Sequence, residues 1–369
     1  MKTFYDVLII GGGQAGLAAG FHLKDTGLSY AILDASARVG DSWRQRYDSL
    51  TLFTPRRLSQ LPGLSLFGDA DGYAGKEEFA SYLETYATKH SLPVQSGVQV
   101  TRLARRGEGF EVETTLGQSL EARNVIVASG AFQTAVVPPI ASGFDAEVQQ
   151  LTVSEYRNPA QLPHGAVLIV GDGASGRDIA ADLVSTRKVY LAGGRPRRLL
   201  PEKLFSQSIW SWLDRLGLMR AGPDSLVGRI MRRRDPFPDR NRSNRALTGM
   251  GIALTGRLVS ATGKKATFSD GSSHEVETVI WAAGYKDESQ WIDIPAARDL
   301  QGNITQNGGI SSVPGLHFLG RPWQRNRASA LIMGAGEDAK VVTQAIIHST
   351  RGSRTEIKLQ QGTRSIAAL

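Results

Sequence analysis

The chain has 369 residues and a formal net charge of +8 at pH 7, with 41% hydrophobic and 21% charged residues. One hydrophobic core rarely extends over this length, so two domains are expected. The composition is typical of a globular protein, and the complete absence of cysteine excludes disulfides, thiolate metal sites and cysteine nucleophiles.

The N-terminal residues show no targeting pattern. Residues 1–6 lead directly into an apolar segment, without the features of a signal peptide. No apolar run approaches the roughly 18 residues that a membrane span needs. The six histidines lack the spacing of metal ligands. We therefore expect a cytoplasmic protein with no membrane-spanning segment and no metal site.

The first motif is a glycine-rich turn near the N-terminus. An apolar run at residues 7–10, typical of a buried parallel strand, precedes G-x-G-x-x-G at Gly11, Gly13 and Gly16. A helical pattern follows, and a second apolar strand then ends in Asp34. Gly11 permits the tight turn, Gly13 lets the backbone approach a pyrophosphate, and Gly16 allows close packing of helix and strand.

The helix N-terminus and the terminal acid complete this first site. Free N–H groups and the positive end of the helix dipole attract phosphate. Asp34 follows Gly16 by 18 residues, where a carboxylate can accept hydrogen bonds from an adenosine ribose. G-x-G-x-x-G alone is weak evidence, but strand, turn, helix, strand and acid in this order predict a dinucleotide-binding site.

The same pattern recurs in the middle of the chain. An apolar strand at residues 167–170 precedes Gly171, Gly173 and Gly176, and a helical pattern leads to a strand at residues 188–191. The sequence therefore predicts a second dinucleotide-binding site.

The two sites differ where the second strand of each one ends. In the second site no carboxylate follows the strand, and Arg195, Arg197 and Arg198 come after two glycines. Arginine suits a 2′-phosphate, through bidentate charge-assisted hydrogen bonds. The sequence favours NADP(H) over NAD(H) here, unless these arginines only begin a basic surface.

Small residues also end other strands of the sequence. Two apolar strands end at Gly130 and Gly284, where the backbone can run close to a ligand, and both suit crossings between nucleotide domains. A strand and turn at residues 315–320 precede a helix that opens near Gly334. The N-terminus of that helix could face a flavin ring, where negative charge develops on reduction.

These elements predict an α/β fold with two Rossmann-like dinucleotide-binding domains, arranged as in glutathione-reductase-like flavoproteins. Residues 1–135 would form the first part of an FAD-binding domain, and residues 285–369 would complete it. Residues 136–284 would form an inserted NADP-binding domain. The absence of cysteine excludes the C-x-x-C redox pair that many such two-nucleotide flavoenzymes carry beside the flavin.

Two segments carry no such motif. Seven arginines lie between Arg229 and Arg245, which fits a dock for phosphates, nucleic acid or an anionic membrane, or a solvated face. We favour the solvated face, because the aromatic-basic pattern of a nucleic-acid module is absent. Within residues 201–250, the helical spacing from Ile209 to Leu216 fits burial in the same domain, a substrate channel, a dimer contact or a membrane surface, and we favour burial.

Together the motifs resemble a known family, the short bacterial flavin-containing monooxygenases. These are class B flavoprotein monooxygenases, related to the larger FMO, the plant auxin-forming and the Baeyer–Villiger enzymes. Beyond the glycine motifs, the likeness rests on Gly40-Asp41-Ser42-Trp43-Arg44, Arg46-Tyr47-Asp48-Ser49-Leu50, Thr54-Pro55-Arg56, the Ala-Ala-Gly-Tyr strand end at residues 282–285, and Phe318-Leu319-Gly320 with the later Gly-Glu-Asp-Ala.

The resemblance implies a mechanism that uses FAD and NADPH. NADPH would reduce the flavin, O2 would add to it, and the resulting C4a-peroxyflavin would transfer one oxygen atom to a sulfide, an amine or a ketone. The protein would position the rings and exclude water. Gly40, Trp43 and Arg44 would lie along the FAD, with Val100 at the adenine and the helix of Asp338 at the flavin. Trp43 also fits an ordinary core aromatic.

The expected site follows from the motifs and the resemblance together. The residues expected near the reacting atoms are Phe53, Trp43 and Arg44. The residues expected to contact the cofactors are Gly11, Gly13, Gly16, Asp34, Gly40, Trp43, Arg44, Thr54, Val100, Gly130, Gly171, Gly173, Ser175, Gly176, Arg195, Arg197, Gly284, Gly320 and Asp338.

The sequence departs from the family pattern at two places. Members that oxygenate sulfur and nitrogen resemble Y-x-S-L-x-x-N-x-P, and here Phe53 stands at the Asn position. A phenyl ring cannot hydrogen-bond a hydroperoxide. The family fingerprint F-x-G-x-x-x-H-x-x-x-(Y/F) is also missing, since Ala146 and Gln150 stand at the Gly and His positions counted from Phe144. Both departures argue against tight NADP+ retention and efficient coupling.

Three functions are therefore compared. The leading one is an FAD-dependent monooxygenase that consumes NAD(P)H and oxygenates small S- or N-nucleophiles, or ketones. The alternative is an NAD(P)H oxidase or quinone reductase without oxygen transfer, and the third is a flavin-binding sensor without turnover. The expected partners are a small-molecule substrate and O2, with no nucleic acid. A homodimer is the commonest assembly of soluble oligomers.

Overall fold

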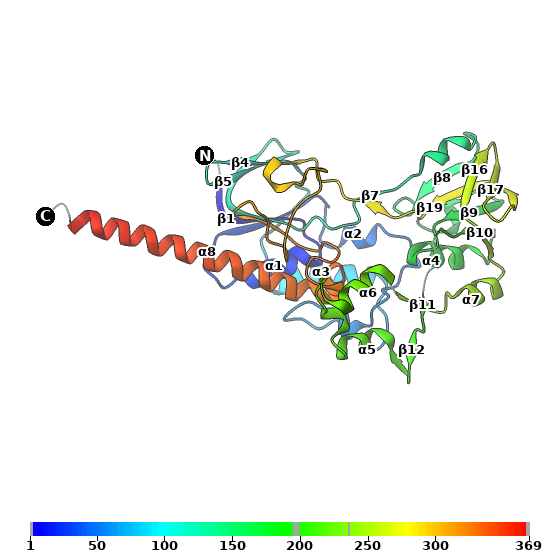
Figure 1. The fold of residues 1–369 in the computed structure, drawn as a ribbon, viewed down its shortest axis with the longest axis horizontal. Coiled ribbons are helices and arrows are strands. Elements are labelled where there is room, and N and C mark those ends of the chain that lie inside the picture. The colour runs from blue at the N-terminus through cyan, green and yellow to red at the C-terminus, as the bar shows by residue number, and fades with distance from the viewer. Residues whose placement is uncertain (1–2, 195–198, 235–236, 367–369) are drawn as a thin grey trace.

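Two main sheets organise the computed structural model, which describes residues 3–194, 199–234 and 237–366 (Figure 1). The first sheet has the strand order β21-β4-β5-β6-β1-β2-β3, and β22 pairs with β6. Its strands are β1 (Phe4–Ile10), β2 (Tyr30–Asp34), β3 (Val94–Ser96), β4 (Val100–Arg106), β5 (Gly109–Thr114), β6 (Ser119–Val127), β21 (Ile292–Asp293) and β22 (Leu316–Phe318).

The parallel part of this sheet forms around its most apolar strand. β1 runs parallel to both β2 and β6, and its last four residues are buried. A strand that is covered on both faces needs such a continuous apolar run. The strands β4, β5 and β6 instead pair antiparallel, with polar residues alternating toward solvent along β5. The first glycine loop follows the carboxyl end of β1 directly.

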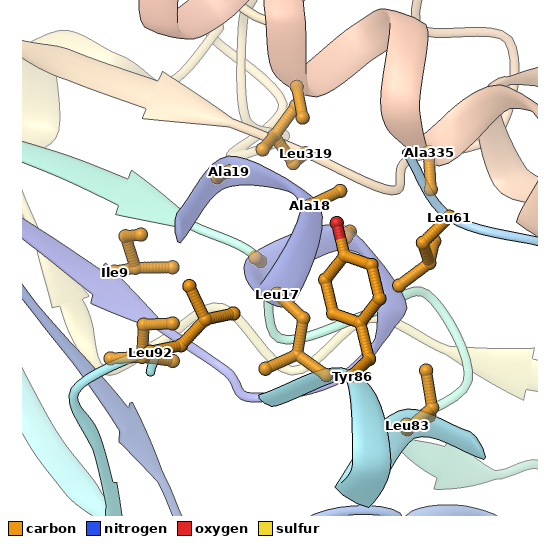
Figure 2. Packing of buried hydrophobic residues seen from close by; sticks show 14 of the residues in the cluster. Ile9, Leu17, Ala18, Ala19, Leu61, Leu83, Tyr86, Leu92, Leu319 and Ala335 are labelled. Carbon is orange, nitrogen blue, oxygen red and sulfur yellow. The ribbon is translucent and has the colours of Figure 1, made fainter. Parts of the chain in front are cut away.

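Three helices pack on one another beside this sheet, namely α1 (Gln14–Leu23), α3 (Lys76–Lys89) and α8 (Ile332–Ile366). α1 is buried over most of its surface because Ala and Gly let its neighbours approach closely. Figure 2 shows Leu17 and Ala18 of α1 facing Tyr86 of α3. This packing fixes the start of α1, and with it the glycine turn.

The second sheet is entirely parallel, in the order β15-β10-β9-β19-β8. Its central strand, β9, leads into the second glycine loop and then into α4 (Ala174–Leu183). A small antiparallel sheet of β16, β17 and β18 adjoins it. The strands are β8 (Gln149–Thr152), β9 (Ala166–Val170), β10 (Lys188–Ala192), β15 (Ala253–Thr255), β16 (Leu258–Thr262), β17 (Lys265–Phe268), β18 (Ser273–Glu275) and β19 (Thr278–Trp281).

The chain passes twice between the sheets, beside one short pair of strands. β7 (Thr134–Ala135) and β20 (Tyr285–Lys286) pair antiparallel, directly before and after the segment that forms the second sheet. The expected mixed α/β fold with parallel sheets is confirmed. The division into domains at residues 135 and 284 stays a prediction, and these positions lie at this strand pair.

The remaining elements are short, and several of them lie between β10 and β15. The helices are α2 (Asp41–Arg44), α5 (Ile209–Arg215), α6 (Leu226–Arg234) and α7 (Asn244–Gly249). The strands are β11 (Leu199–Leu200), β12 (Lys203–Leu204), β13 (Gln207–Ser208) and β14 (Phe237–Pro238). The 3-10 turns are η1 (Arg56–Leu58), η2 (Pro139–Gly143), η3 (Pro159–Gln161), η4 (Leu218–Arg220), η5 (Pro295–Ala297) and η6 (Arg327–Ala330).

A buried histidine makes the stability of the first sheet depend on pH. His317 lies on β22 beside β6, and its Nδ1 has no partner among the described residues. Burial lowers the pKa of His317 to about 4, from 6.5 in an unfolded chain. Between pH 6.5 and pH 4 the unfolded chain takes up a proton at His317 and the folded chain does not. The free energy of unfolding is therefore highest above pH 6.5 and decreases as the pH falls toward 4.

We expect the free energy of unfolding to decrease by about 2 kcal/mol between pH 7.5 and pH 5 through this group alone. Urea titrations at both pH values measure the change, with His317→Leu as the comparison. The variant should show a correspondingly smaller pH dependence than the parent. Equal pH dependence in both proteins would contradict the assignment to His317.

Candidate cofactor and substrate site

One large cavity connects the two sheets. Its volume is about 1650 Å³ and its lining includes both glycine loops. A typical pocket for a single small ligand has a volume of about 300–1,000 Å³, so this cavity has room for more than one. The expected site residues that line it are Gly11, Gly13, Asp34, Trp43, Phe53, Thr54, Val100, Gly130, Gly171, Gly173, Ser175, Gly176, Gly284 and Gly320.

Other expected site residues lie elsewhere. Arg195 and Arg197 lie outside the described residues. The residues that the structure places outside the cavity lining are Gly16, Gly40, Arg44 and Asp338. Each of these four has a packing or pairing role behind the cavity wall, as described below.

The first glycine loop leaves open space where a phosphate could lie. Gly13 immediately precedes α1, and a side-chain carbon built on Gly13 would meet nothing within 4 Å. One built on Gly16 would come far closer than 3.0 Å to the carbonyl oxygen of Gly11. Gly16 is therefore required by the fold itself, whereas the space at Gly13 fits the pyrophosphate of a dinucleotide.

Asp34 orders this loop and also faces the cavity. Its Oδ2 accepts a hydrogen bond from the Gly12 N–H at 2.5 Å, and its Oδ1 accepts one from the Ser36 N–H at 2.7 Å. Each carboxylate oxygen keeps capacity for a second donor. The carboxylate can therefore hold the turn and still receive ribose hydroxyls.

The second glycine loop repeats the first in detail. Gly11 and Gly171 have φ angles of +111° and +115°, and each approaches a carbonyl of the strand that crosses to the other sheet. A side-chain carbon on Gly176 would collide with the carbonyl of Gly171, just as one on Gly16 would with that of Gly11. The same backbone requirements are met twice, so the structure contains two equivalent helix N-termini that face one cavity.

A buried arginine attaches part of the basic segment to this second loop. Arg177 of α4 is almost fully buried, and it donates to the carbonyl of Asp172 at 2.9 Å and to the carbonyl of Arg242 at 2.6 Å. It also donates to Asn244 Oδ1 at 2.8 Å. Part of the segment between Arg229 and Arg245 is thus folded against α4.

A further arginine lies where the second strand of this site ends. Arg257 follows β15, which runs parallel to β10, and it lines the cavity together with Gly193 and Gly194. Its side chain is exposed. Sequence reasoning missed Arg257, because only the strand pairing brings it beside the end of β10.

Trp43 and Arg44 have different environments although they are neighbours. The Trp43 ring packs edge-on against Phe79 at 4.9 Å and also lines the cavity, so it is both a core aromatic and a cavity residue. The Arg44 guanidinium pairs with Asp41, Glu77 and Glu84 at 2.8–3.2 Å. Arg44 therefore fixes α2 to α3 and acts at most as a positioning residue for the cavity.

Gly40 and Asp338 also stand behind the wall. A side-chain carbon on Gly40 would collide with the carbonyl of Ala80 in α3. Asp338 is buried in α8 and pairs with Arg325 at 3.1 Å, and burial raises the pKa of its carboxyl group. The first turn of the same helix, through Ile332 and Ala335, does line the cavity.

Phe53 belongs to an apolar wall built from distant segments. Its ring lies 5.8 Å from that of Trp210 on α5, and both residues line the cavity. Trp210 is 1% exposed, and its Nε1 has no hydrogen-bond partner among the described residues. Trp210, within segment 201–250, is therefore buried and is also part of the cavity wall. Trp323 and Leu331 extend this apolar surface.

A polar bridge joins the loop before Phe53 to α4. The Tyr47 hydroxyl donates to Asp178 Oδ2 at 3.2 Å. Arg240 donates to the same Asp178 oxygen at 2.7 Å and to the Thr51 hydroxyl oxygen at 2.5 Å. Burial, followed by the charge of Asp178, raises the pKa of Tyr47. The bridge fixes the loop that carries Phe53 relative to α4.

Gln150, which stands at the missing fingerprint histidine, is used for packing. Its Oε1 accepts a hydrogen bond from Trp281 Nε1 at 3.1 Å, and its amide donates to the carbonyl of Ala141 at 3.2 Å. Gln150 does not line the cavity. Its amide therefore supports the wall of the second sheet.

The comparisons with known proteins agree with this geometry. The model of a family described as pyridine nucleotide-disulphide oxidoreductase matches residues 8–212. The chain belongs to this family. It is 42% identical to an uncharacterized CzcO-like oxidoreductase of Geobacillus kaustophilus (strain HTA426), over 94% of this chain and 100% of the relative.

Two further comparisons place the chain among monooxygenases. A flavin-containing monooxygenase from Stenotrophomonas maltophilia is similar with a TM-score of 0.78 and 26% identity, over 94% of this chain and 99% of that one. An indole-3-pyruvate monooxygenase (YUCCA1) of Oryza sativa subsp. japonica is 27% identical, over 83% and 82%. The resemblance to flavin-containing monooxygenases is confirmed, and the protein is an oxidoreductase.

The structure adds two negative findings for the part of the chain that it describes. No group of three or more His, Cys, Asp or Glu residues there could hold a metal ion. No helix of that part is long and apolar enough to cross a bilayer.

Proposed function

We propose that the chain is an FAD-dependent monooxygenase that uses NADPH and O2 to oxygenate small apolar nucleophiles at sulfur or nitrogen. The single observation that carries the proposal is the cavity in which both glycine loops meet the apolar wall of Phe53 and Trp210. Two dinucleotides bound at these loops could place their rings at one wall, beside an apolar substrate. Ketones remain a further substrate class.

FAD is assigned to the first loop and NADP(H) to the second. Asp34 faces the first site, where its carboxylate would accept hydrogen bonds from the hydroxyls of an unmodified ribose. The end of β10 has no such acid, and the exposed Arg257 stands beside it. A guanidinium suits a 2′-phosphate, which supports NADPH over NADH.

The chain contributes positioning and water exclusion. When bound, the two cofactors supply hydride transfer and the activation of O2. The helix N-termini after Gly13 and Gly173 would hold the phosphates, and the Tyr47–Asp178–Arg240 bridge would keep the two sites in register. Phe53, Trp210 and their apolar neighbours would keep water away from the reacting atoms.

The second candidate is an NAD(P)H oxidase or quinone reductase. Phe53 favours it, because the ring offers no hydrogen-bond donor in the cavity wall where related enzymes carry an amide. Electrons from NADPH would then reach O2 or a quinone without oxygen transfer to a substrate.

One experiment separates these candidates. Purified holoprotein is mixed with NADPH, air and methyl phenyl sulfide, and flavin absorbance, hydrogen peroxide and sulfoxide are followed together. Sulfoxide in proportion to the NADPH consumed supports the monooxygenase. Peroxide in that proportion without sulfoxide would establish the oxidase instead. A flavin that neither NADPH nor NADH bleaches would leave only a binding role.

A substitution at position 53 tests the role of the cavity wall. We expect Phe53→Asn to raise the sulfoxide formed per NADPH by roughly fivefold, because one hydrogen bond contributes about 1 kcal/mol. Phe53→Leu removes the ring without adding a donor and serves as the control. An equal ratio in the two variants would show that a donor at this position does not limit coupling.

A further inference from the structure

Segment 199–234 has two sides of different character. Its inner side joins the apolar cluster beside Phe53 through Trp210, Met219 and Met231. Figure 1 draws this segment in green, with α5 and β12 at the lower edge of the view and α6 above them; β12 and β13 form a hairpin. Several side chains of the segment are exposed to solvent.

The hairpin tip presents large apolar side chains to solvent. The side chain of Phe205 is 82% exposed, at a turn where the backbone has positive φ at residues 205 and 206. The Phe205 ring meets that of Trp212 at 6.3 Å, and Trp212 Nε1 donates to the carbonyl of Leu204 at 2.9 Å. Leu216, one turn after Trp212 on α5, is 67% exposed. These contacts hold the apolar tip in place.

The next helix, α6, also exposes apolar side chains to solvent. Gly228 and Met231 face inward, and Leu226, Val227 and Ile230 are exposed. Exposed apolar side chains of single residues are ordinary, but six of them within one short segment are not. We call the outer face of this segment the apolar-basic face. Its apolar residues are Leu204, Phe205, Leu216, Leu226, Val227 and Ile230.

The same segment also carries exposed basic residues. Segment 199–234 contains seven lysines and arginines and three acidic residues. Asp214 is paired with Arg220 at 3.5 Å, and Glu202 hydrogen-bonds Tyr73, so two of the three acids are already engaged. The exposed basic residues are Lys203, Arg215, Arg220, Arg229, Arg232, Arg233 and Arg234.

We propose that the apolar-basic face binds the surface of an anionic phospholipid bilayer. Apolar side chains can enter the boundary between headgroups and acyl chains, while lysine and arginine meet the phosphates. A second copy of the chain fits less well, because a two-fold interface would bring this basic face against itself. None of the apolar residues of this face lines the cavity, and of its basic residues only Arg232 does, so the proposed binding is separable from the proposed reaction.

The test is co-sedimentation of the holoenzyme with vesicles of phosphatidylglycerol, or of phosphatidylcholine, at low salt. The enzyme is expected to sediment with phosphatidylglycerol and to remain in solution with phosphatidylcholine. The double variant Phe205→Ser with Leu216→Ser should bind roughly 100-fold more weakly, because it removes two apolar side chains that would enter the lipid interface. Arg233→Gln with Arg234→Gln should bind roughly 25-fold more weakly, at about fivefold per charge.

Leu300→Ser is the matched control, because Leu300 is fully exposed outside this segment and its loss should leave vesicle binding unchanged. Flavin content and NADPH oxidation without vesicles should be unchanged in every variant, which shows that each one is folded. Equal binding to both lipids, or an equal loss in Leu300→Ser, would overturn the proposal. The proposal would also be overturned if the parent protein were a dimer and the Phe205 and Leu216 double variant a monomer, because this face would then be a contact between two copies of the chain.

Discussion

Gly13→Ala is expected to fold like the parent chain and to bind its flavin more weakly. The backbone at Gly13 has φ −76° and ψ −174°, which alanine adopts without strain, and its side-chain carbon would meet no protein atom within 4 Å. The only space it fills is the space assigned to the pyrophosphate. Overpacking a close contact costs about 1–3 kcal/mol, so we expect flavin affinity to fall roughly 10- to 100-fold.

Gly16→Ala, three residues later, provides the contrast. Its side-chain carbon would collide with the carbonyl of Gly11, so strand and helix would have to separate. We expect this variant to lose about 3 kcal/mol of stability even without flavin. Thermal unfolding of flavin-free protein, together with flavin absorbance after reconstitution, separates the two effects. A parent-like dissociation constant for flavin in Gly13→Ala would exclude the first loop as the pyrophosphate site.

Gly176→Ala should abolish the use of nicotinamide nucleotide while the flavin is retained. The side-chain carbon would collide with the carbonyl of Gly171 and displace the start of α4, but the first loop is built on a different sheet. We expect the KM for NADPH to rise about 100-fold or more, or reduction to stop, at full flavin occupancy. Stopped-flow reduction of the bound flavin measures this directly.

Arg257→Ala is the matched variant for the second site, because it removes a charge without moving the loop. It should raise the KM for NADPH by roughly tenfold and leave that for NADH unchanged, as expected for one charge-assisted hydrogen bond. Equal effects on both nucleotides would show that Arg257 does not contact the 2′-phosphate. Flavin loss from Gly176→Ala would instead show that FAD and the nicotinamide nucleotide had been assigned to the wrong loops.

Local requirements explain why both glycine loops could be recognised from the sequence. Gly11 needs a positive φ, and Gly16 must leave room for a carbonyl only five residues before it. These conditions involve residues close together in the chain, so they leave a fixed spacing. The same holds for the apolar strands before each loop, since a strand buried on both faces must be apolar throughout.

Contacts between distant segments could not be found in this way. Arg257 stands beside the end of β10 only because β15 pairs there, and Phe53 meets Trp210 only because α5 packs on the cavity wall. The ion pairs of Arg44 also depend on tertiary structure. The resemblance suggested a cofactor contact for Arg44, and the structure adds three carboxylates around its guanidinium that join α2 to α3.

The sequence alone therefore determined the mixed α/β class, the two glycine loops and the absence of a cysteine pair. All three depend on residue type and local spacing. Only the tertiary structure decided that both loops open into one cavity, that Phe53 and Trp210 form its apolar wall, and that segment 199–234 turns an apolar and basic face outward. These features arise because elements far apart in the sequence pack together. Such contacts do not require a fixed number of residues between the partners, so they leave no recognisable pattern in the sequence.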